Sequence, residues 1–301
     1  MVTIITPDTS VISRKIEDYP EGIIIPINKP YRWTSADVIR KVKFAAVRHF
    51  AKKKLKVGHA GTLDPLATGV LLVCIGPATK LAESLQAQPK EYIAGIAFGA
   101  TTPSYDLEKE IDRFFPHKHI TKESIEAVLP EFLGEQNQVA PLFSAKTIDG
   151  VRAYELAREL FKKRTIQERQ SSSIEAQGIE SSIFDATAEE VIRVSRINIT
   201  ELELVAFGKP APVYDSEGED SNNNNMGASS RINVTNNSAL GLPRADIRIA
   251  CSKGTYVRAF ARDLGEALNS GAHLDFLQRS QSGGFRVENC LSVSQTINLL
   301  L

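Results

Sequence analysis

The sequence has few cysteines, and their spacing fits no metal site. Cys74, Cys251 and Cys290 are its three cysteines, and none belongs to a Cys-x-x-Cys or Cys/His pattern. This argues against a zinc site and against a disulfide framework, and it suits a reducing compartment. Cys74 lies inside an apolar run and is expected in the core. We therefore expect no metal, and nothing else in the sequence calls for a cofactor.

Long apolar runs are also missing. No stretch approaches the roughly 18 apolar residues of a membrane-spanning helix. The first 20 residues contain Asp8, Glu17 and Asp18 and have no long apolar block, so neither a secretory nor a mitochondrial signal is indicated. These absences predict a cytoplasmic protein that does not contact a membrane.

Net charge is the third absence, because 36 basic residues balance 36 acidic ones. Nucleic-acid-binding domains are usually basic, so the total argues against that class, but the distribution does not. Eight lysines and arginines lie within residues 40–56, which we call the basic segment, and no acidic residue lies between Asp37 and Asp64. This segment is either a solvated helix face or a phosphate-binding surface. We favour phosphate contact because the segment leads into a loop that carries an acid.

The composition is that of an ordinary globular protein, with 42% hydrophobic and 24% charged residues over 301 positions. No internal repeat is present. Residues 1–20 are expected to form an irregular arm and residues 21–295 a single domain. Two polar stretches, the Ser/Gln/Glu-rich residues 166–190 and the Asn-rich residues 214–239, are expected to be disordered surface insertions.

Hydrophobic periodicity and capping signals predict an α+β fold with a mixed, largely antiparallel central sheet flanked by helices. A hydroxyl cap at Thr34 with an acid at Asp37 starts one helix, and Gly95 marks a bulge or a close approach in a strand. Residues 70–75 are a buried helix or a buried strand, which periodicity does not decide. The remaining predicted elements are strands over 21–27, 91–98, 197–206 and 247–251, and helices over 124–133 (capped by Thr121), 153–161 and 255–268.

Residues 58–69, the acid loop, combine Asp64, His59, three glycines and a rigid Asp-Pro step. Asp64 has two interpretations, which can coexist. It can be the N-cap of a helix over residues 65–75, with Pro65 as the first helical residue. It can also be a nucleophile or an electrostatic stabiliser in glycosyl chemistry.

A reactive Asp64 would have to work as a lone carboxylate. The second nearby carboxylate of most glycosidases is missing from the loop, which argues against ordinary glycoside hydrolysis. A lone carboxylate in a dry pocket needs a cation beside it to stay ionised, and Arg258 is a candidate. Gly254 and Thr255 do not form a nucleotide-binding P-loop, because the glycine-rich stretch before the lysine is absent.

These motifs together resemble one family, the TruB-type transfer-RNA pseudouridine-55 synthases. The acid loop is similar to the family's catalytic motif nearly residue for residue. The resemblance covers residues 22–160 and 196–290, and its other motifs are residues 28–35, 76–80, 90–92, 251–258, 262–266 and 271–274.

The resemblance implies that one uridine in the T-loop of tRNA, at the T-arm and elbow, is isomerised to pseudouridine. On that basis Asp64 would be the nucleophile that detaches uracil, and Arg258 would pair with it. Tyr92 would stack against the flipped base and is a candidate for the base that removes a proton. Base flipping into an aromatic and apolar pocket agrees with this chemistry. The resemblance also implies contacts with RNA for His59, Lys80, Leu277, Lys29, Lys53 and Lys253, although Leu277 also fits a plain core position.

The sequence departs from the family pattern in three places, and these departures leave other functions open. The family's lysine is expected one position after Lys146, where Thr147 stands, and Gln278 replaces the first of two arginines. The chain ends at Leu301 and is expected to lack a C-terminal RNA-binding domain, as in the shorter bacterial form, and to act as a monomer without a protein partner. One alternative is an RNA-binding or tRNA-folding protein whose catalysis is lost or secondary. A guide-RNA-dependent synthase is disfavoured, since residues 66–67 look bacterial.

Overall fold

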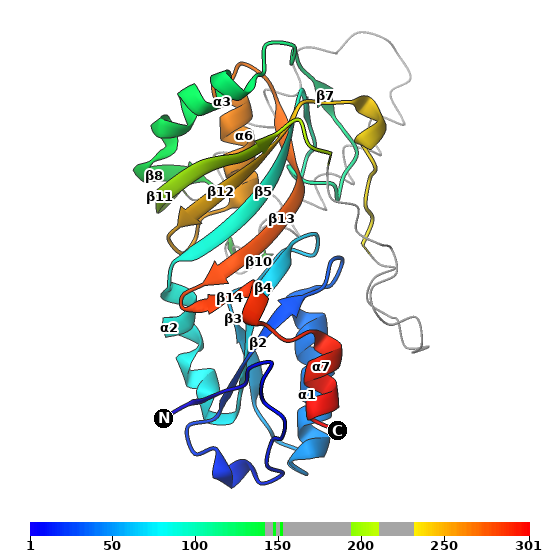
Figure 1. Ribbon diagram of the computed structural model, residues 1–301, viewed down its shortest axis with the longest axis vertical. Coiled ribbons are helices and arrows are strands. Elements are labelled where there is room, and N and C mark those ends of the chain that lie inside the picture. Colours follow the sequence, from blue (N-terminus) through cyan, green and yellow to red (C-terminus); the bar gives the residue numbers. More distant parts are fainter. Residues whose placement is uncertain (142–146, 149–150, 153–193, 211–231) are drawn as a thin grey trace.

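A mixed β-sheet runs the length of the molecule and joins its two ends (Figure 1). The computed structural model describes residues 1–141, 147–148, 151–152, 194–210 and 232–301. Within these residues the strand order is β1-β2-β4-β13-β5-β12-β11-β8, with β3 on β4 and β14 on β13. The bounds are β1 (Thr3–Ile4), β2 (Ile23–Lys29), β3 (Val57–Ala60), β4 (Thr68–Ile75), β5 (Lys90–Phe98), β8 (Gly134–Val139), β11 (Val194–Phe207), β12 (Arg244–Cys251), β13 (Ala272–Ser282) and β14 (Phe285–Arg286).

The pairing confirms the predicted fold class. In this sheet β1 and β2 are parallel, as are β4 and β13, and the other pairs are antiparallel. Two short ribbons add β6 (Ala100–Thr101) with β7 (Arg113–Phe114), and β9 (Thr147–Ile148) with β10 (Val151–Arg152).

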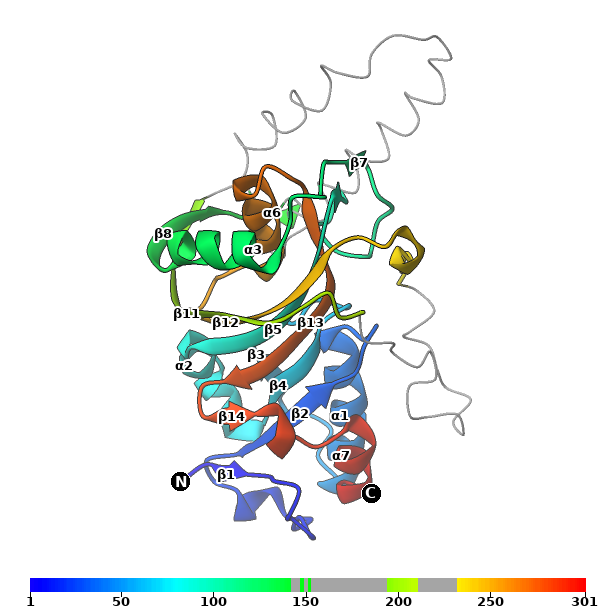
Figure 2. The same cartoon turned by 45° about the horizontal axis from the view of Figure 1, so that its top comes forward.

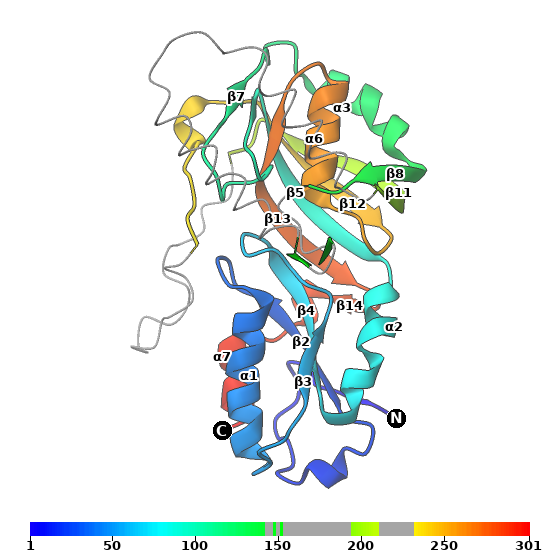
Figure 3. The same ribbon diagram turned by 180° about the vertical axis from the view of Figure 1, so that it is seen from behind.

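Helices flank the sheet at both ends. α1 (Ser35–His49) and α7 (Val293–Leu299) lie side by side at one end, and α6 (Val257–Ala267) lies against the other half, as Figure 3 shows from behind. α2 (Ala82–Ala87) and α3 (Lys122–Val128) complete the α-helices of the described residues, none of which is both long and apolar enough to cross a membrane. Short 3-10 helices span Ile16–Asp18, Gly76–Leu81, Leu129–Phe132, Ser238–Leu240 and Val287–Asn289.

The two predicted helix caps, Thr34 and Thr121, are confirmed, whereas the helix predicted from residue 255 starts at Val257. Thr34 caps α1 through the backbone N–H of Asp37, and the Asp37 side chain accepts from the backbone of Thr34, which satisfies two otherwise unpaired donors. Thr121 and Ser124 form the equivalent box before α3. α3 changes to a 3-10 helix earlier than predicted, at Leu129, because Pro130 cannot donate an α-helical hydrogen bond.

The interpretation of Asp64 as a helix cap is wrong, because the residues that follow it form a strand. β4 begins at Thr68, and all eight of its residues are buried. Both of its faces are covered: Leu71 and Val73 belong to the main core, which includes residues of α1, and Val70 and Leu72 pack with Leu85 of α2. A strand in such a place shows a continuous apolar run rather than an alternating one, which explains why periodicity did not separate strand from helix.

The N-terminal arm contains little regular structure, but it packs onto the body. Its first strand, β1, pairs with β2 (Figure 2). Ile5, Ile12 and Ile16 are all buried in the main core. Their spacing of seven and four matches one face of a helix, but residues 5–15 form no helix, so periodicity gives the wrong reason for their burial.

The end of the expected Asn-rich insertion also belongs to the folded body. The backbone N–H of Thr235 donates to Leu107 O (2.8 Å), and the Arg32 guanidinium donates to Ile232 O (2.8 Å). The rest of that insertion before residue 232 lies outside the described residues. The same is true of the insertion at 166–190, the predicted helix at 153–161 and Lys146.

Candidate active site

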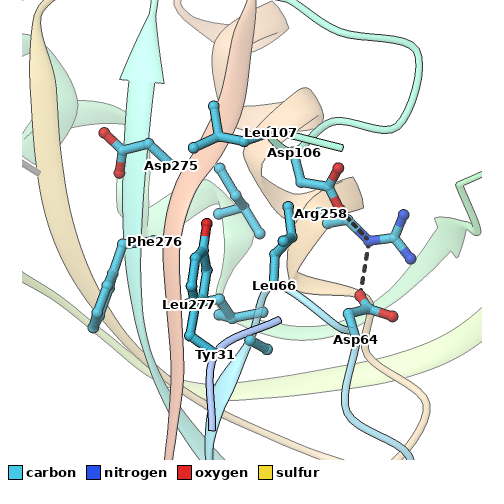
Figure 4. Close-up of a pocket in the computed structure, with 11 residues that line it drawn as sticks. Tyr31, Asp64, Leu66, Asp106, Leu107, Arg258, Asp275, Phe276 and Leu277 are labelled. Atoms are coloured by element: carbon cyan, nitrogen blue, oxygen red, sulfur yellow. Dashed lines mark hydrogen bonds and ion pairs between the residues drawn. The ribbon is translucent and has the colours of Figure 1, made fainter. Parts of the chain in front are cut away.

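Asp64 lies in the turn that joins β3 to β4, with its side chain 39% exposed. It lines a pocket whose other walls come from β13, α6 and the loop after β6 (Figure 4). Apolar side chains, among them Leu66 and Leu277, form much of the lining. The acid is therefore reachable from solvent, yet it borders an apolar cavity.

Arg258, at the start of α6, forms an ion pair with Asp64, Nε to Oδ2 at 2.9 Å, as the sequence predicted. Its guanidinium is buried, with 6% of the side chain exposed. Burial alone would lower the pKa of Arg258, but the carboxylates of Asp64 and Asp106 raise it above the ordinary value. Arg258 therefore stays charged, and it keeps a counter-charge at the pocket for Asp64.

Asp106 is a second acid at this arginine, and the sequence analysis missed it. Its Oδ2 lies 3.8 Å from Arg258 Nε, while Ser104 Oγ and the Glu108 N–H donate to its Oδ1. Burial raises the pKa of Asp106, and the attraction of Arg258 opposes that rise. The sequence offers one weak indication of this role: Asp106 follows a Thr-Thr-Pro-Ser turn that comes after a strand. Many surface loops have an acid in such a place, so the pattern does not identify a functional residue.

A fully buried arginine, Arg279, hydrogen-bonds to the backbone of the acid loop. The sequence analysis did not identify it. Its guanidinium donates to three backbone carbonyls, those of Val70 (2.7 Å), Gly61 (3.2 Å) and Thr62 (3.4 Å). Gly69 is required beside it, because a Cβ there would lie 2.2 Å from Arg279 O and its φ is +103°. This side chain thus fixes both ends of the turn that carries Asp64.

Helix α1 anchors the same loop from another side. The Ser35 hydroxyl accepts from the backbone N–H of Leu63 at 3.0 Å. Because Ser35 is the first residue of α1, the start of that helix and the acid loop are fixed to each other.

Lys29 departs from its expected role. It is 0% exposed, and its ammonium donates to the carbonyls of Pro30 (2.9 Å), Trp33 (2.5 Å) and Pro65 (3.2 Å). A completely buried amine cannot reach the phosphates of an RNA on the surface, so contact between Lys29 and RNA is wrong for this structure. Lys29 instead holds the acid loop at Pro65.

Tyr92 on β5 and Leu277 on β13 belong to adjacent strands near the acid. Tyr92 pairs in register with Arg279, and Leu277 pairs with Ala94. Burial raises the pKa of Tyr92, and the nearby Arg279 opposes that rise. Leu277 is 8% exposed, so it is both a core residue and part of the pocket lining.

None of the remaining predicted RNA contacts is among the residues that line the pocket. Lys53, Lys80 and Lys253 are exposed, and His59 on β3 is half-buried. Burial, reinforced by Arg279, lowers the pKa of His59, so its ring is mainly neutral near pH 7. Gln278, in the place where the family typically has an arginine, is half-buried and pairs with Thr68 of β4.

The arrangement defines a class of enzyme. An ionised carboxylate beside a permanently charged arginine and an apolar cavity suits the opening of the bond between a flipped-out base and its ribose. Such a site on a mixed, largely antiparallel sheet is consistent with the class of pseudouridine synthases.

Comparisons with known proteins identify the family. Residues 48–195 match the model of the TruB family pseudouridylate synthase (N terminal domain). The tRNA pseudouridine synthase B of Phocaeicola vulgatus is 41% identical over 277 residues, 92% of each chain. That of Bacteroides thetaiotaomicron is 42% identical over 275 residues, 91% of each chain. The chain belongs to the TruB family of pseudouridine synthases.

Solved structures agree on the fold. A Cbf5-Nop10-Gar1 complex contains a chain with a TM-score of 0.54 and 21% identity. An H/ACA RNP bound to a substrate RNA containing 2'-deoxyuridine gives a TM-score of 0.51 with 19% identity. These matches cover 97% and 92% of this chain, which spans 59% and 53% of the respective solved chains.

Proposed function

We propose that the protein isomerises uridine-55 in the T-loop of tRNA to pseudouridine, with Asp64 as the group that detaches uracil. The observation that carries this proposal is the Asp64–Arg258 ion pair at the edge of an apolar pocket. Support for the substrate comes from relatives named tRNA pseudouridine synthase B that align over 92% of this chain. We further propose that it works in the cytoplasm as a monomer, without a protein partner.

The reaction conserves every atom of the nucleoside. The bond between N1 of uracil and C1′ of the ribose breaks, the base turns, and a bond between C5 and C1′ forms. The proton on C5 leaves and N1 gains one, so no oxidant, reductant or co-substrate is required. The protein must supply an electron pair to release the base, a pocket in which the base can turn, and a way to move one proton.

Two acids around one arginine suit the step that involves Asp64. While Asp64 carries its full charge, Arg258 is paired with it at 2.9 Å. When the Asp64 carboxylate enters a covalent bond, its charge is lost and the buried guanidinium needs another partner. Asp106, 3.8 Å from the same nitrogen, is already in place to provide it.

Tyr92 serves better as a stacking surface than as a base. Its burial raises its pKa, so the phenol stays protonated at neutral pH and is a poor proton acceptor. A neutral aromatic ring beside Leu277 gives the released uracil two apolar surfaces between which it can turn.

Phosphate contacts would come from exposed basic residues outside the pocket. Lys253 and Lys80 are exposed, and the basic segment runs along α1 and the loop that follows it. Such contacts position the RNA, while the flipped base is read in the pocket.

The test is to map pseudouridine on unmodified tRNA after incubation with the wild-type protein and with Asp64→Asn. We expect one pseudouridine at position 55 with wild type and none with the variant. Binding of tRNA should remain within about threefold, because the acid performs chemistry rather than recognition. Glu83→Gln, an exposed acid on α2, is the matched control and should behave as wild type.

Two results would reject the proposal. One is a folded wild-type protein that forms no pseudouridine, and the other is turnover by Asp64→Asn. The alternative of an RNA-folding protein predicts instead that Asp64→Asn restores the growth of a deletion strain as well as wild type does.

A further inference from the structure

The turn between β2 and α1 contains an arginine in a backbone conformation that disfavours arginine. Arg32 has a φ of +62°, which lies in the left-handed region where glycine is favoured. Strained residues of this kind persist where the surrounding structure requires them, and they cluster at active sites. The same turn carries Tyr31, which lines the pocket, so the strain lies directly beside the site.

The side chain of Arg32 connects this turn to the end of the Asn-rich insertion. Its Nη2 donates to Ile232 O at 2.8 Å, and both residues are half-buried. A glycine at position 32 would relieve the backbone strain, but it could not make this hydrogen bond. The arginine therefore trades local backbone stability for a contact with a residue 200 positions away.

Three residues further on, the same segment holds the loop that contains Asp106. The backbone N–H of Thr235 donates to Leu107 O at 2.8 Å, and its hydroxyl lies 3.2 Å from the same oxygen and 3.3 Å from Lys109 O. Leu107 lines the pocket and directly follows Asp106, whose carboxylate lies 3.8 Å from Arg258. Thr235 thus fixes the backbone next to the second acid at this arginine.

A third contact joins the segment to β13. Burial lowers the pKa of His273, so its ring is neutral. Its Nδ1 lies 2.9 Å from Ala100 O, which can only accept, so Nδ1 carries the proton and Nε2 accepts from the Asn237 amide at 3.4 Å. His273 directly precedes Leu274, which lines the pocket. Residues 232–237, which we call the strap, therefore contact three elements that border the pocket.

We propose that the strap holds two walls of the pocket in the arrangement that turnover requires, with Arg32 and Thr235 as its positioning residues. Tyr31 and Leu107 lie on different sides of the pocket (Figure 4). The strap joins the turn that carries the first to the loop that carries the second. This proposal rests on the proposed function, because the turnover of tRNA is the quantity that the strap would affect.

The effect should fall on kcat rather than on KM. Neither Arg32 nor Thr235 is among the residues that line the pocket, so they act through its geometry. The base has to leave its stack and turn between these walls, and a misplacement of about 1 Å in an active site can reduce the rate about a hundredfold. A displaced Asp106 would also leave the buried Arg258 guanidinium without a second carboxylate when Asp64 loses its charge.

The first test compares Arg32→Gly with Ala51→Gly, by urea unfolding and by kcat and KM on unmodified tRNA. Ala51 is exposed and has a φ of +50°, so glycine relieves the same kind of strain there without cutting the strap. We expect Ala51→Gly to keep the wild-type kcat. Arg32→Gly should lower kcat about threefold to thirtyfold, although its backbone suits the turn better. Its KM should stay within about threefold of wild type.

The second test removes the other positioning contact. Thr235→Val loses the hydroxyl but keeps the shape and the backbone N–H, and it should lower kcat about threefold to tenfold. Thr235→Ser retains the hydroxyl and should stay within about twofold of wild type. Thr200→Val, which removes a hydroxyl bond to Ala250 O on the surface of the sheet, is the matched control and should keep kcat. The double variant Arg32→Gly/Thr235→Val should be at most about twofold slower than the slower single variant, because both changes cut the same strap.

Four results would overturn the strap. They are a wild-type kcat in both Arg32→Gly and Thr235→Val, a rise in KM with kcat unchanged, losses that multiply in the double variant, and a fall in kcat that equals the fall in folded fraction of the same samples. The second would mean that Arg32 grips RNA, and the fourth that the strap serves folding alone. All four leave the proposed function standing. If wild type itself forms no pseudouridine, the proposed function has failed and the strap fails with it.

Discussion

At the scale of single residues, the charge balance at Asp64 depends on how one buried arginine is shared. Arg258 has Asp64 at 2.9 Å and Asp106 at 3.8 Å, and its Nη1 donates to Ser104 O at 3.1 Å. Removing one of the two carboxylates leaves a buried cation that is only partly compensated, which costs about 1–3 kcal/mol. Asp106 is thus a positioning residue for the Asp64–Arg258 pair.

We therefore predict that Asp106→Asn lowers kcat about tenfold to a hundredfold, since about 1.4 kcal/mol of barrier corresponds to a factor of ten. The KM for tRNA should change little, because Asp106 is buried. Single-turnover and steady-state assays on unmodified tRNA measure both quantities. Glu110→Gln, an exposed acid of the same loop, is the control. A variant with unchanged kcat, or with an effect on KM alone, would contradict this role.

The sequence identified some of these residues and not others, for physical reasons. Asp64 and Arg258 lie 194 positions apart, yet each stands in a motif rich in glycine, hydroxyl and basic residues. Asp106 and Arg279 have no such surroundings, since their roles come from burial and from the partners that the fold supplies. Lys29 was found but misinterpreted, because a lysine beside a proline gives no indication that it will be completely buried.

At the scale of elements, the acid loop is fixed by neighbours rather than by a helix of its own. The predicted caps of α1 and α3 depend on side chains within three residues of each other, so the sequence was sufficient there. The burial of β4 depends instead on what the fold places over its two faces, the main core on one and α2 on the other. The sequence did not decide between a strand and a helix for residues 70–75, because local periodicity contains no information about the elements that pack on them.

Lys29 is the junction where β2, the start of α1 and the acid loop meet, and it should give the protein a measurable pH dependence. Burial lowers its pKa to about 7, against an ordinary value of 10.5. Between these values the unfolded chain holds a proton that the folded chain does not. Stability therefore rises with pH across this window, and below about 7 Lys29 adds no further pH dependence because both states are protonated.

We predict that Lys29→Met removes the part of the pH dependence of stability that comes from Lys29. The free energy of unfolding of wild type, relative to that of the variant, should increase by up to ~1.4 kcal/mol per pH unit between pH 7.5 and 9. Urea titrations at several pH values measure the difference. Lys90, whose burial lowers its pKa to about 8, contributes equally to both proteins and cancels. Lys52→Met, on the surface, should run parallel to wild type, and a parallel curve for Lys29→Met would refute the prediction.

At the scale of the whole molecule, neutral total charge coexists with a strongly basic region. α1 starts at Ser35, in contact with the acid loop, and its 15 residues extend about 22 Å from there. Arg40, Lys43 and Arg48 are exposed along it, and Lys52, Lys53, Lys54 and Lys56 are exposed after it. An RNA that has its target base at Asp64 and also reaches these lysines must extend well beyond the loop that holds the target.

The last prediction concerns this reach. Each lysine that contacts a phosphate adds roughly 0.7–0.9 to the slope of log K against log salt. Substituting Lys52 and Lys53 by Gln should therefore weaken tRNA binding and flatten that slope by about 1.5, with kcat unchanged. Lys118→Gln with Lys122→Gln, an equal loss of exposed charge beside α3, should leave the slope as it is. A short hairpin that ends before α1 does should bind the Lys52/Lys53 variant as well as wild type. If the variant weakens tRNA and the short hairpin alike, the two lysines act through general attraction, and the extended contact is refuted.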